Sequence, residues 1–171
     1  KKNSEIEGLW LQNCGLGAAP VAVVKSLFET IGHSQIRFLS LQKNGLGTAR
    51  TEIVSVICKA LAKNTTISFL SLSNDDLGSA DPMSLKVLGK LFQLSGVEEV
   101  NLEGTGLGLA SEENMSLLCD ALLQSQRIKK LILDSNKLNQ APPRVMMILC
   151  EMLEKFDLTH VSFGNNGLSC P

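Results

Sequence analysis

The sequence predicts an α/β solenoid in which short parallel strands alternate with helices. One apolar pattern, I/L/V-x-x-L/V-x-L/F-x-x-N-x-L, occurs six times along the 171 residues, beginning at positions 6, 36, 67, 97, 128 and 158. Repetition at a nearly constant interval of about 30 residues is the signature of a stacked repeat architecture. Between the copies, apolar residues recur with helical periodicity, so strands and helices are expected to alternate throughout.

Each repeat is expected to begin with a short strand that buries one face. The fourth and sixth positions are apolar in every repeat, as Leu39 and Leu41 illustrate, and strand alternation places both on the same face. Because a helix follows each strand, successive strands must run parallel, with the helices crossing on the other side. The expected shape is a right-handed, horseshoe-like arc with strands on the concave face and helices on the convex face.

A turn is expected after each strand. The ninth position of every repeat carries a short side chain that can bond backbone groups where the strand turns away. These residues are Cys14, Asn44, Asp75, Thr105, Asn136 and Asn166. Glycines surround the turn in nearly every repeat, which a turn requires and a nucleotide site does not, so no phosphate-binding loop is predicted.

Each turn leads to a predicted helix with one apolar face. In the first five repeats, apolar residues lie 18, 21 and 25 positions after the start, which is helical spacing. Pro20, Pro82 and Pro143 mark helix starts, because proline is tolerated in the first helical turn.

Three cysteines occupy one equivalent position of this helix. Cys58, Cys119 and Cys150 each lie 22 residues after the start of their repeat. A shared position on the apolar face predicts one shared packing role, in which free cysteine acts as a small hydrophobe. We therefore expect reduced thiols in a reducing compartment, rather than a disulfide scaffold, a metal site or a catalytic thiol.

These repeats resemble leucine-rich repeats of the ribonuclease-inhibitor type, whose consensus pairs the strand LxxLxLxxN/CxL with a full helix. The resemblance covers essentially the whole chain, so residues 1–171 are interpreted as a single leucine-rich repeat domain. The repeats are slightly longer than is usual for that type, and Cys14, Asp75 and Thr105 replace the asparagine in three of them. Neither end carries a polar capping repeat, so we expect a fragment of a longer array, or ends covered by another element.

Composition argues against several functions. A net charge of -1, from 16 basic and 17 acidic residues, provides no basic stripe for phosphates, so nucleic acid is not an expected partner. The chain lacks the run of about 18 apolar residues that a membrane span needs. Its two histidines, His33 and His160, lie in the first and sixth repeats, and tyrosine is absent, so we expect no enzyme, metal or cofactor. The expected location is intracellular and cytoplasmic.

The outward-facing strand positions, the third, fifth and seventh of each repeat, are the candidate binding positions. The only tryptophan and two of the six phenylalanines lie among them, all within the first three repeats. Because parallel strands lie about 4.8 Å apart, Trp10, Phe38 and Phe69 are predicted to form one exposed apolar patch. Such a patch is typical of an interaction site.

The fourth and fifth repeats are expected to add an acidic surface beside this patch. It consists of Glu98, Glu99, Glu103 and Asp134, partly balanced by Lys129 and Lys130. A partner with a basic rim would fit it, although solvated charges without a partner would explain the same pattern. The complete set of predicted protein-binding residues is Trp10, Phe38, Phe69, Glu99, Asn101, Glu103, Lys130, Ile132, Asp134 and His160.

The preferred hypothesis is a non-catalytic recognition module that binds another protein, for example an enzyme with a basic rim, through the concave sheet. Inhibition would follow if the bound surface contained an active site. The resemblance implies two alternatives. One is a sensing or autoinhibitory array of an innate-immune-type receptor, or an effector of an intracellular bacterium acting in the host cytosol. The other is GTPase activation of the Ran type, for which Arg50 and Asn44 would project from turns.

Overall fold

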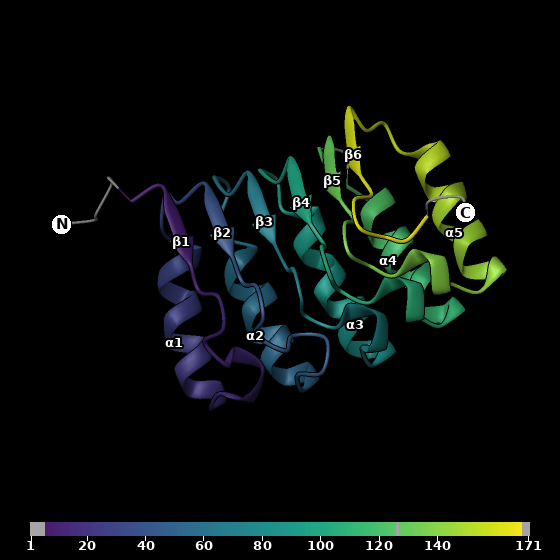
Figure 1. Ribbon diagram of the computed structural model, residues 1–171. Helices are drawn as coiled ribbons and strands as arrows, with labels where there is room; N and C mark the ends of the chain where they lie inside the picture. Colours follow the sequence, from purple (N-terminus) through teal and green to yellow (C-terminus); the bar gives the residue numbers. More distant parts are fainter. Residues whose placement is uncertain (1–5, 126, 169–171) are drawn as a thin grey trace.

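The computed structural model describes residues 6–125 and 127–168 and shows a solenoid of alternating strands and helices (Figure 1). Six strands form one sheet in chain order, and every neighbouring pair is parallel and in register. They are β1 (Gly8–Trp10), β2 (Phe38–Ser40), β3 (Phe69–Ser71), β4 (Glu99–Asn101), β5 (Lys130–Ile132) and β6 (His160–Ser162). The predicted parallel sheet is confirmed.

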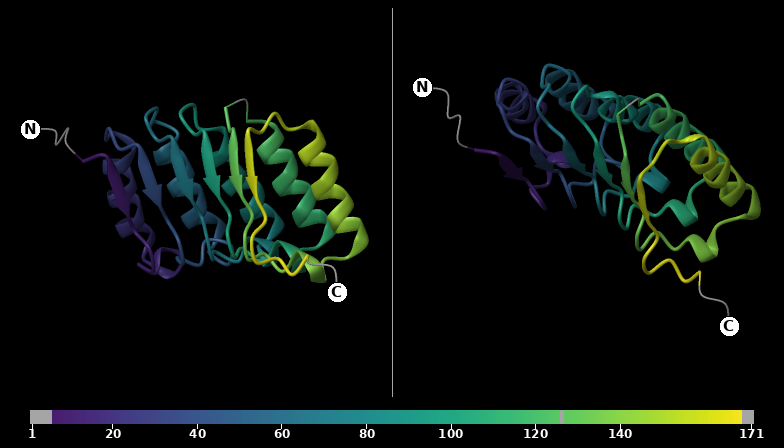
Figure 2. Two further views of the ribbon diagram at one scale, coloured as in Figure 1. Left: turned by 45° about the horizontal axis from the view of Figure 1, so that its top comes forward. Right: turned by 90° about the horizontal axis from the view of Figure 1, so that it is seen from above.

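Within the described residues, five α-helices cover one face of this sheet: α1 (Val21–Gly32), α2 (Thr51–Leu61), α3 (Pro82–Leu88), α4 (Glu112–Leu123) and α5 (Pro143–Lys155). Short 3-10 helices follow four of the strands and extend α3. They are η1 (Leu16–Ala18), η2 (Leu77–Ser79), η3 (Gly89–Gln93), η4 (Leu107–Leu109) and η5 (Leu138–Gln140). The helices lie on the outer side of an arc and the strands on its inner side (Figure 2).

The third helix departs from the regular pattern. Asp81 caps its start, since the carboxylate accepts a hydrogen bond from the Ser84 N–H at 2.9 Å. The α-helical part ends at Leu88 and continues as the tighter η3, so α3 is shorter than the sequence suggests. Gly89 lies at this change, and a β-carbon added there would be only 2.6 Å from the β-carbon of Ala121 on α4. The tightening therefore coincides with a close approach of two neighbouring helices.

The core lies between the sheet and the helices, at the repeat positions that the sequence predicted. Leu39 and Leu70, at the fourth position, are fully buried, as are Ile57 and Leu61 on α2. These residues belong to one continuous hydrophobic cluster that runs along the array. Over residues 6–125 and 127–168, the structure contains no helix with the length and apolarity needed to cross a bilayer.

Burial falls at the last repeat, which corrects one prediction. Val161, at the same repeat position as Leu39, is 44% exposed. Cys150 is exposed, whereas Cys58 and Cys119 are buried, so the shared packing role predicted for the three cysteines is wrong for Cys150. The physical reason is that repeats bury their apolar residues against neighbours on both sides, and the described chain places no helix beyond α5.

The two buried thiols have the packing role that the sequence predicted. The Cys58 thiol donates a hydrogen bond to the carbonyl of Val87, on the next helix, at 3.3 Å. Burial raises the pKa of Cys58 and of Cys119 to about 12, because it disfavours the charged thiolate. Both thiols are therefore neutral at physiological pH and poor nucleophiles or metal ligands.

The ninth-position side chains bond backbone groups at the turns, as predicted, and they also form a ladder that connects the turns of successive repeats. The buried Asn136 donates from its amide to backbone carbonyls of two successive repeats, and its oxygen accepts from the Leu107 N–H at 3.2 Å. Asn44 and Asn166 make the equivalent bonds in the second and sixth repeats. These bonds satisfy backbone N–H and carbonyl groups that have no strand partner at the turn.

The turns also contain backbone in the left-handed conformation. At the tenth position, four of the six repeats have glycine with φ between +66° and +78°. Asp76 and Lys137 occupy the same position in the third and fifth repeats, with φ of +53° and +56°. A side chain in this conformation lies too close to the following carbonyl, which costs roughly 1 kcal/mol.

Replacing Lys137 with glycine is therefore expected to increase the free energy of unfolding by roughly 1 kcal/mol, because the strain is removed. Urea denaturation followed by circular dichroism measures the change. Lys137→Ala is the matched control, since it removes the charge and keeps the β-carbon. Equal stabilisation by both substitutions would show that the backbone strain is not the cause.

Candidate protein-binding face

The in-register sheet arranges its outward side chains in rows that cross the strands. The third-position row runs through Gly8, Phe38, Phe69, Glu99, Lys130 and His160, and the fifth-position row through Trp10, Ser40, Ser71, Asn101, Ile132 and Ser162. Eight of the ten predicted binding residues lie in these two rows. The remaining two, Glu103 and Asp134, lie two residues after the ends of β4 and β5, at the seventh position.

The aromatic residues lie on the adjacent strands β1, β2 and β3, with Trp10 at the fifth position and Phe38 and Phe69 at the third. The ring centroids of Phe38 and Phe69 lie 6.3 Å apart, with an angle of 45° between the ring planes. Trp10 is 65% exposed, and its indole lies against Gly8: a β-carbon on Gly8 would be 2.3 Å from the ring. Since Gly8 pairs with Phe38, the indole covers the third position that glycine leaves empty. We call Trp10, Phe38 and Phe69 the aromatic row.

A depression of about 490 Å³ lies beside the aromatic row. Its lining residues come from the first four repeats: Trp10, Gln12, Asn13, Ser40, Gln42, Lys43, Phe69, Ser71 and Asn101. The small, buried Ser40 and Ser71 line the depression together with the larger Trp10 and Phe69, so the hollow lies beside two aromatic side chains. Such a hollow can receive an apolar side chain of a partner.

Only part of this lining belongs to the predicted set of binding residues, namely Trp10, Phe69 and Asn101. The other lining residues, which are not in that set, are Gln12, Asn13, Ser40, Gln42, Lys43 and Ser71. The sequence does indicate a depression here, because the fifth-position row has tryptophan in the first repeat and serine in the next two. A small residue beside a large one on adjacent strands indicates a concavity.

The predicted acidic surface is partly neutralised. Glu99 pairs with Lys130 at 3.4 Å across β4 and β5, and Glu98 pairs with Arg127 at 3.5 Å. Exposed ion pairs of this kind contribute little to stability, but they remove net charge from the surface. Of the acidic residues predicted there, Glu103 and Asp134 form no salt bridge with another described residue.

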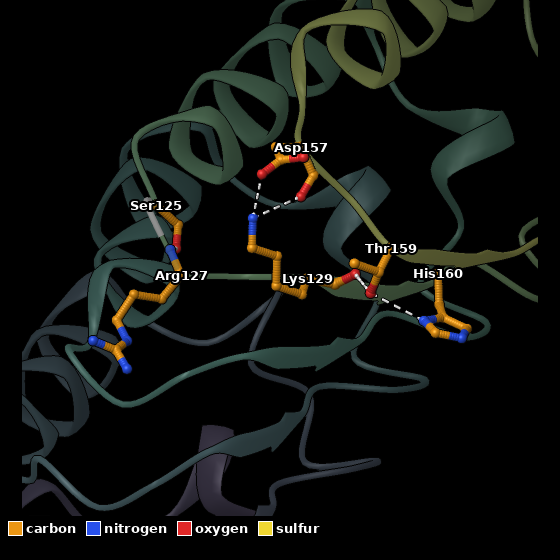
Figure 3. Close-up of polar contacts among 6 residues, drawn as sticks. All are labelled: Ser125, Arg127, Lys129, Asp157, Thr159 and His160. Atoms are coloured by element: carbon orange, nitrogen blue, oxygen red, sulfur yellow. Dashed lines mark hydrogen bonds and ion pairs between the residues drawn. The ribbon is translucent and has the colours of Figure 1, made fainter.

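Lys129 does not balance this acidic surface, contrary to the prediction. Its ammonium group pairs with Asp157, which precedes β6, and also donates to the Asp157 carbonyl at 3.1 Å (Figure 3). The hydrogen bond and charge of Lys129 lower the pKa of Asp157. In the same view, His160 contacts the hydroxyl of Thr159 at 3.0 Å and is otherwise exposed.

Asp134 is held in place by the last repeat. Its Oδ1 accepts from the Gly164 N–H at 2.7 Å and from the hydroxyl of Ser162. Asn101 is similarly engaged, since its Oδ1 accepts from the Glu103 N–H at 2.8 Å. Ile132, which pairs with Asn101 across β4 and β5, is half-buried. These side chains are therefore ordered before any partner binds.

Of the two residues proposed for GTPase activation, Asn44 does not project from its turn as predicted. Asn44 is buried, and both ends of its amide bond backbone groups, so it cannot project from the turn toward a nucleotide. Arg50 is exposed directly before α2. In the part of the chain that the structure describes, no three His, Cys, Asp or Glu side chains are grouped so as to hold a metal ion.

No protein-family model matches the chain, and no curated protein matches its sequence. Solved structures do match its fold. A leucine-rich repeat-containing protein of Legionella pneumophila is 18% identical with a TM-score of 0.57, and the match covers 95% of this chain. The chain spans 58% of the length of that protein.

Two further solved domains are similar at 15% identity and a TM-score of 0.58. The tropomodulin C-terminal domain of Caenorhabditis elegans matches over 88% of this chain and 86% of its own. Leiomodin-1 actin-binding site 2 matches over 85% of this chain and 80% of its own. At these identities the likeness establishes the fold alone. Together with the six parallel strands and the helices on one side, it shows that the chain is a leucine-rich repeat solenoid.

Proposed function

We propose that the chain is a recognition module that binds a partner protein through the concave face of its sheet. The observation that carries the proposal is the aromatic row. Trp10 and Phe38 are 65% and 39% exposed, although most large apolar residues of the chain are buried. Exposed aromatic side chains beside a hollow are the usual energetic centres of protein interfaces, because they bury a large apolar area at little entropic cost.

The arrangement of these side chains supports the proposal further. Trp10 packs on Gly8, and Phe38 packs on Phe69, so the row is already ordered in the free protein. A partner would therefore lose little entropy in fixing these side chains when it binds. If the partner is an enzyme whose bound surface contains an active site, occlusion would make the chain an inhibitor.

Substituting alanine for Trp10, Phe38 and Phe69 together is expected to lower affinity for the partner at least about a hundredfold, since such anchors are each worth on the order of 2 kcal/mol. Capture from a lysate of the source cells with the unmodified chain identifies the partner. Isothermal titration calorimetry with the purified partner then measures the change.

The matched control is the triple alanine variant of Val23, Met83 and Met147. These residues are also large, apolar and 59%, 61% and 51% exposed, but they lie on the helices. The control is expected to bind as the unmodified chain does. Equal affinities for the two triple variants, with both still folded by circular dichroism, would contradict the proposal.

Actin binding is the second candidate function. The observation that favours it is the similarity to the leiomodin-1 domain, which is named for actin binding and matches over 85% of this chain. Co-sedimentation of the chain with filamentous actin, and calorimetry with monomeric actin, test it directly. Absence of binding in both assays would remove this candidate and leave the concave-face proposal untouched.

A further inference from the structure

The concave face carries its charges unevenly along the array. At the aromatic end, Lys43 is the only ionisable residue among the described residues that line the depression, and the Arg37 guanidinium lies 6.0 Å from the Phe38 ring centroid. Neither cation forms a salt bridge within the described chain. Glu7, before β1, is the only acidic residue at positions two to eight of the first three repeats. Over these positions the charges of Arg37 and Lys43 exceed that of Glu7 by one positive charge.

The other end is net negative. Its remaining carboxylates, after the ion pairs of Glu98 and Glu99, are those of Glu103 and Asp134, on adjacent repeats at the seventh position. Asp134 uses Oδ1 for bonds to the last repeat, so Oδ2 is available to a partner. Two neighbouring carboxylates form a site for a cationic side chain.

The depression at the aromatic end offers hydrogen bonds as well as apolar walls. The side-chain amides of Gln12 and Gln42 line it and bond no other group that the structure describes. Each amide supplies a donor and an acceptor, which is the pairing that an exposed peptide backbone needs. The lining therefore fits an extended peptide segment better than a purely apolar ligand.

We propose that this face takes an extended segment of a partner protein, with an apolar anchor and an adjacent acidic residue at the aromatic end, and a basic residue over Glu103 and Asp134. The inference rests on the proposed function and adds the order of charges to it. The two ends are about 12 Å apart, at about 4.8 Å per strand, and an extended chain advances about 3.3 Å per residue. The basic residue therefore lies about four residues from the anchor.

This charge order excludes other classes of occupant. A nucleic acid or an anionic lipid surface would place phosphates over Glu103 and Asp134 as well as over Lys43, and the carboxylates would repel them. A uniformly basic segment would meet Lys43 and Arg37 at the aromatic end. Only a segment with an acidic residue at the aromatic end and a basic residue over Glu103 and Asp134 complements the charges at both ends.

The test is a selection from a displayed library of random twelve-residue peptides against the full chain, with sequencing of the bound population. Peptides with the order acid, anchor, three residues, base are expected to be enriched about tenfold over those with the two charges exchanged, as expected of a few complementary pairs. The charge-reversed chain, Lys43→Glu with Glu103→Lys, is expected to reverse this preference. Selection against the Trp10, Phe38 and Phe69 triple alanine variant completes the experiment.

The outcomes separate the two proposals. Enrichment of peptides that lack the expected charge order, or that have the opposite order, would overturn this inference. If binding of those peptides still depended on the aromatic row, the proposed function would remain supported. Failure to enrich any peptide would also overturn the inference, since an extended segment would not be the occupant. Enrichment that survives in the triple alanine variant would sink both.

Discussion

Substitution of Asn136 by alanine is expected to lower the free energy of unfolding by about 4 kcal/mol, since several buried backbone groups lose their partners at about 1–3 kcal/mol each. The amide donates to the carbonyls of Leu102 and Leu133 at 2.9 and 3.0 Å, and the oxygen accepts from the Leu107 N–H at 3.2 Å. Asn136 is fully buried, so water cannot replace these bonds without opening the turn.

Urea denaturation of the variant measures this loss, and Asn139→Ala is the matched control. Asn139 has the same side chain, lies in the same turn and is exposed. Its substitution is expected to change stability by no more than about 0.5 kcal/mol. Comparable losses in the two variants would mean that the ladder contributes no more than a surface residue does.

Substitution of Asp75 by asparagine is expected to stabilise the protein at neutral pH. Asp75 takes the ladder position of the third repeat and is fully buried. Its Oδ1 accepts from the N–H groups of Asn44 and Leu46 at 2.8 and 3.0 Å, but its Oδ2 has no partner among the described residues. At the equivalent place, Asn44 and Asn136 present an NH₂ group that donates to backbone carbonyls. An ionised carboxylate cannot donate, so one oxygen stays buried and unpaired.

The energetic cost of burying the Asp75 carboxylate depends on pH. Burial, opposed by the backbone N–H groups and reinforced slightly by the charge of Asp76, raises the pKa of Asp75 from 3.8 to about 6. Because the folded-state pKa is raised, the contribution of Asp75 to the free energy of unfolding is fully present below about pH 4 and is lost as the pH rises through 6. The loss is about 3 kcal/mol, at about 1.4 kcal/mol per pKa unit. Asp75→Asn is expected to abolish it, leaving a gain at pH 8 and little change at pH 4.

Urea denaturation from pH 4 to pH 8 checks this expectation. Asp76→Asn is the control, because it removes a neighbouring carboxylate that is exposed and outside the ladder. Its stability profile is expected to keep the slope of the unmodified chain. Asn136→Asp is the reciprocal variant and is expected to acquire the same kind of slope. If Asp75→Asn and Asp76→Asn gave identical profiles, the buried carboxylate would not be the source of the pH dependence.

Much of the fold was predictable because a repeat array encodes it locally. The strand, the turn and the helical face recur in each repeat, and each repeat contacts mainly its neighbours. Leu39 and Leu70 are buried for this reason, and Asn136 takes part in the ladder as expected. The same periodicity placed Trp10, Phe38 and Phe69 on adjacent strands, which the sheet register confirms.

The repeat periodicity gave wrong predictions where the burial or the contacts of a side chain depend on the neighbouring repeat. Cys150 shares a repeat position with Cys58, yet it is exposed, since burial at this position needs a following helix. Lys129 pairs with Asp157 instead of the acidic surface, because a long flexible side chain can reach either of two neighbours. Asn44 lies near a turn, but its buried side chain bonds the backbone in the ladder and therefore does not project toward a partner.

Apolar spacing and turn chemistry repeat in every unit, so the six-repeat solenoid, its parallel sheet and the strands that carry the aromatic residues could be predicted without coordinates. Three features are seen only in the folded chain: the Trp10 indole lies on Gly8, the depression is lined by Ser40 and Ser71 beside Trp10 and Phe69, and one buried oxygen of Asp75 has no partner among the described residues. These features depend on side-chain rotamers and on the contacts between neighbouring repeats, which a one-dimensional pattern does not specify.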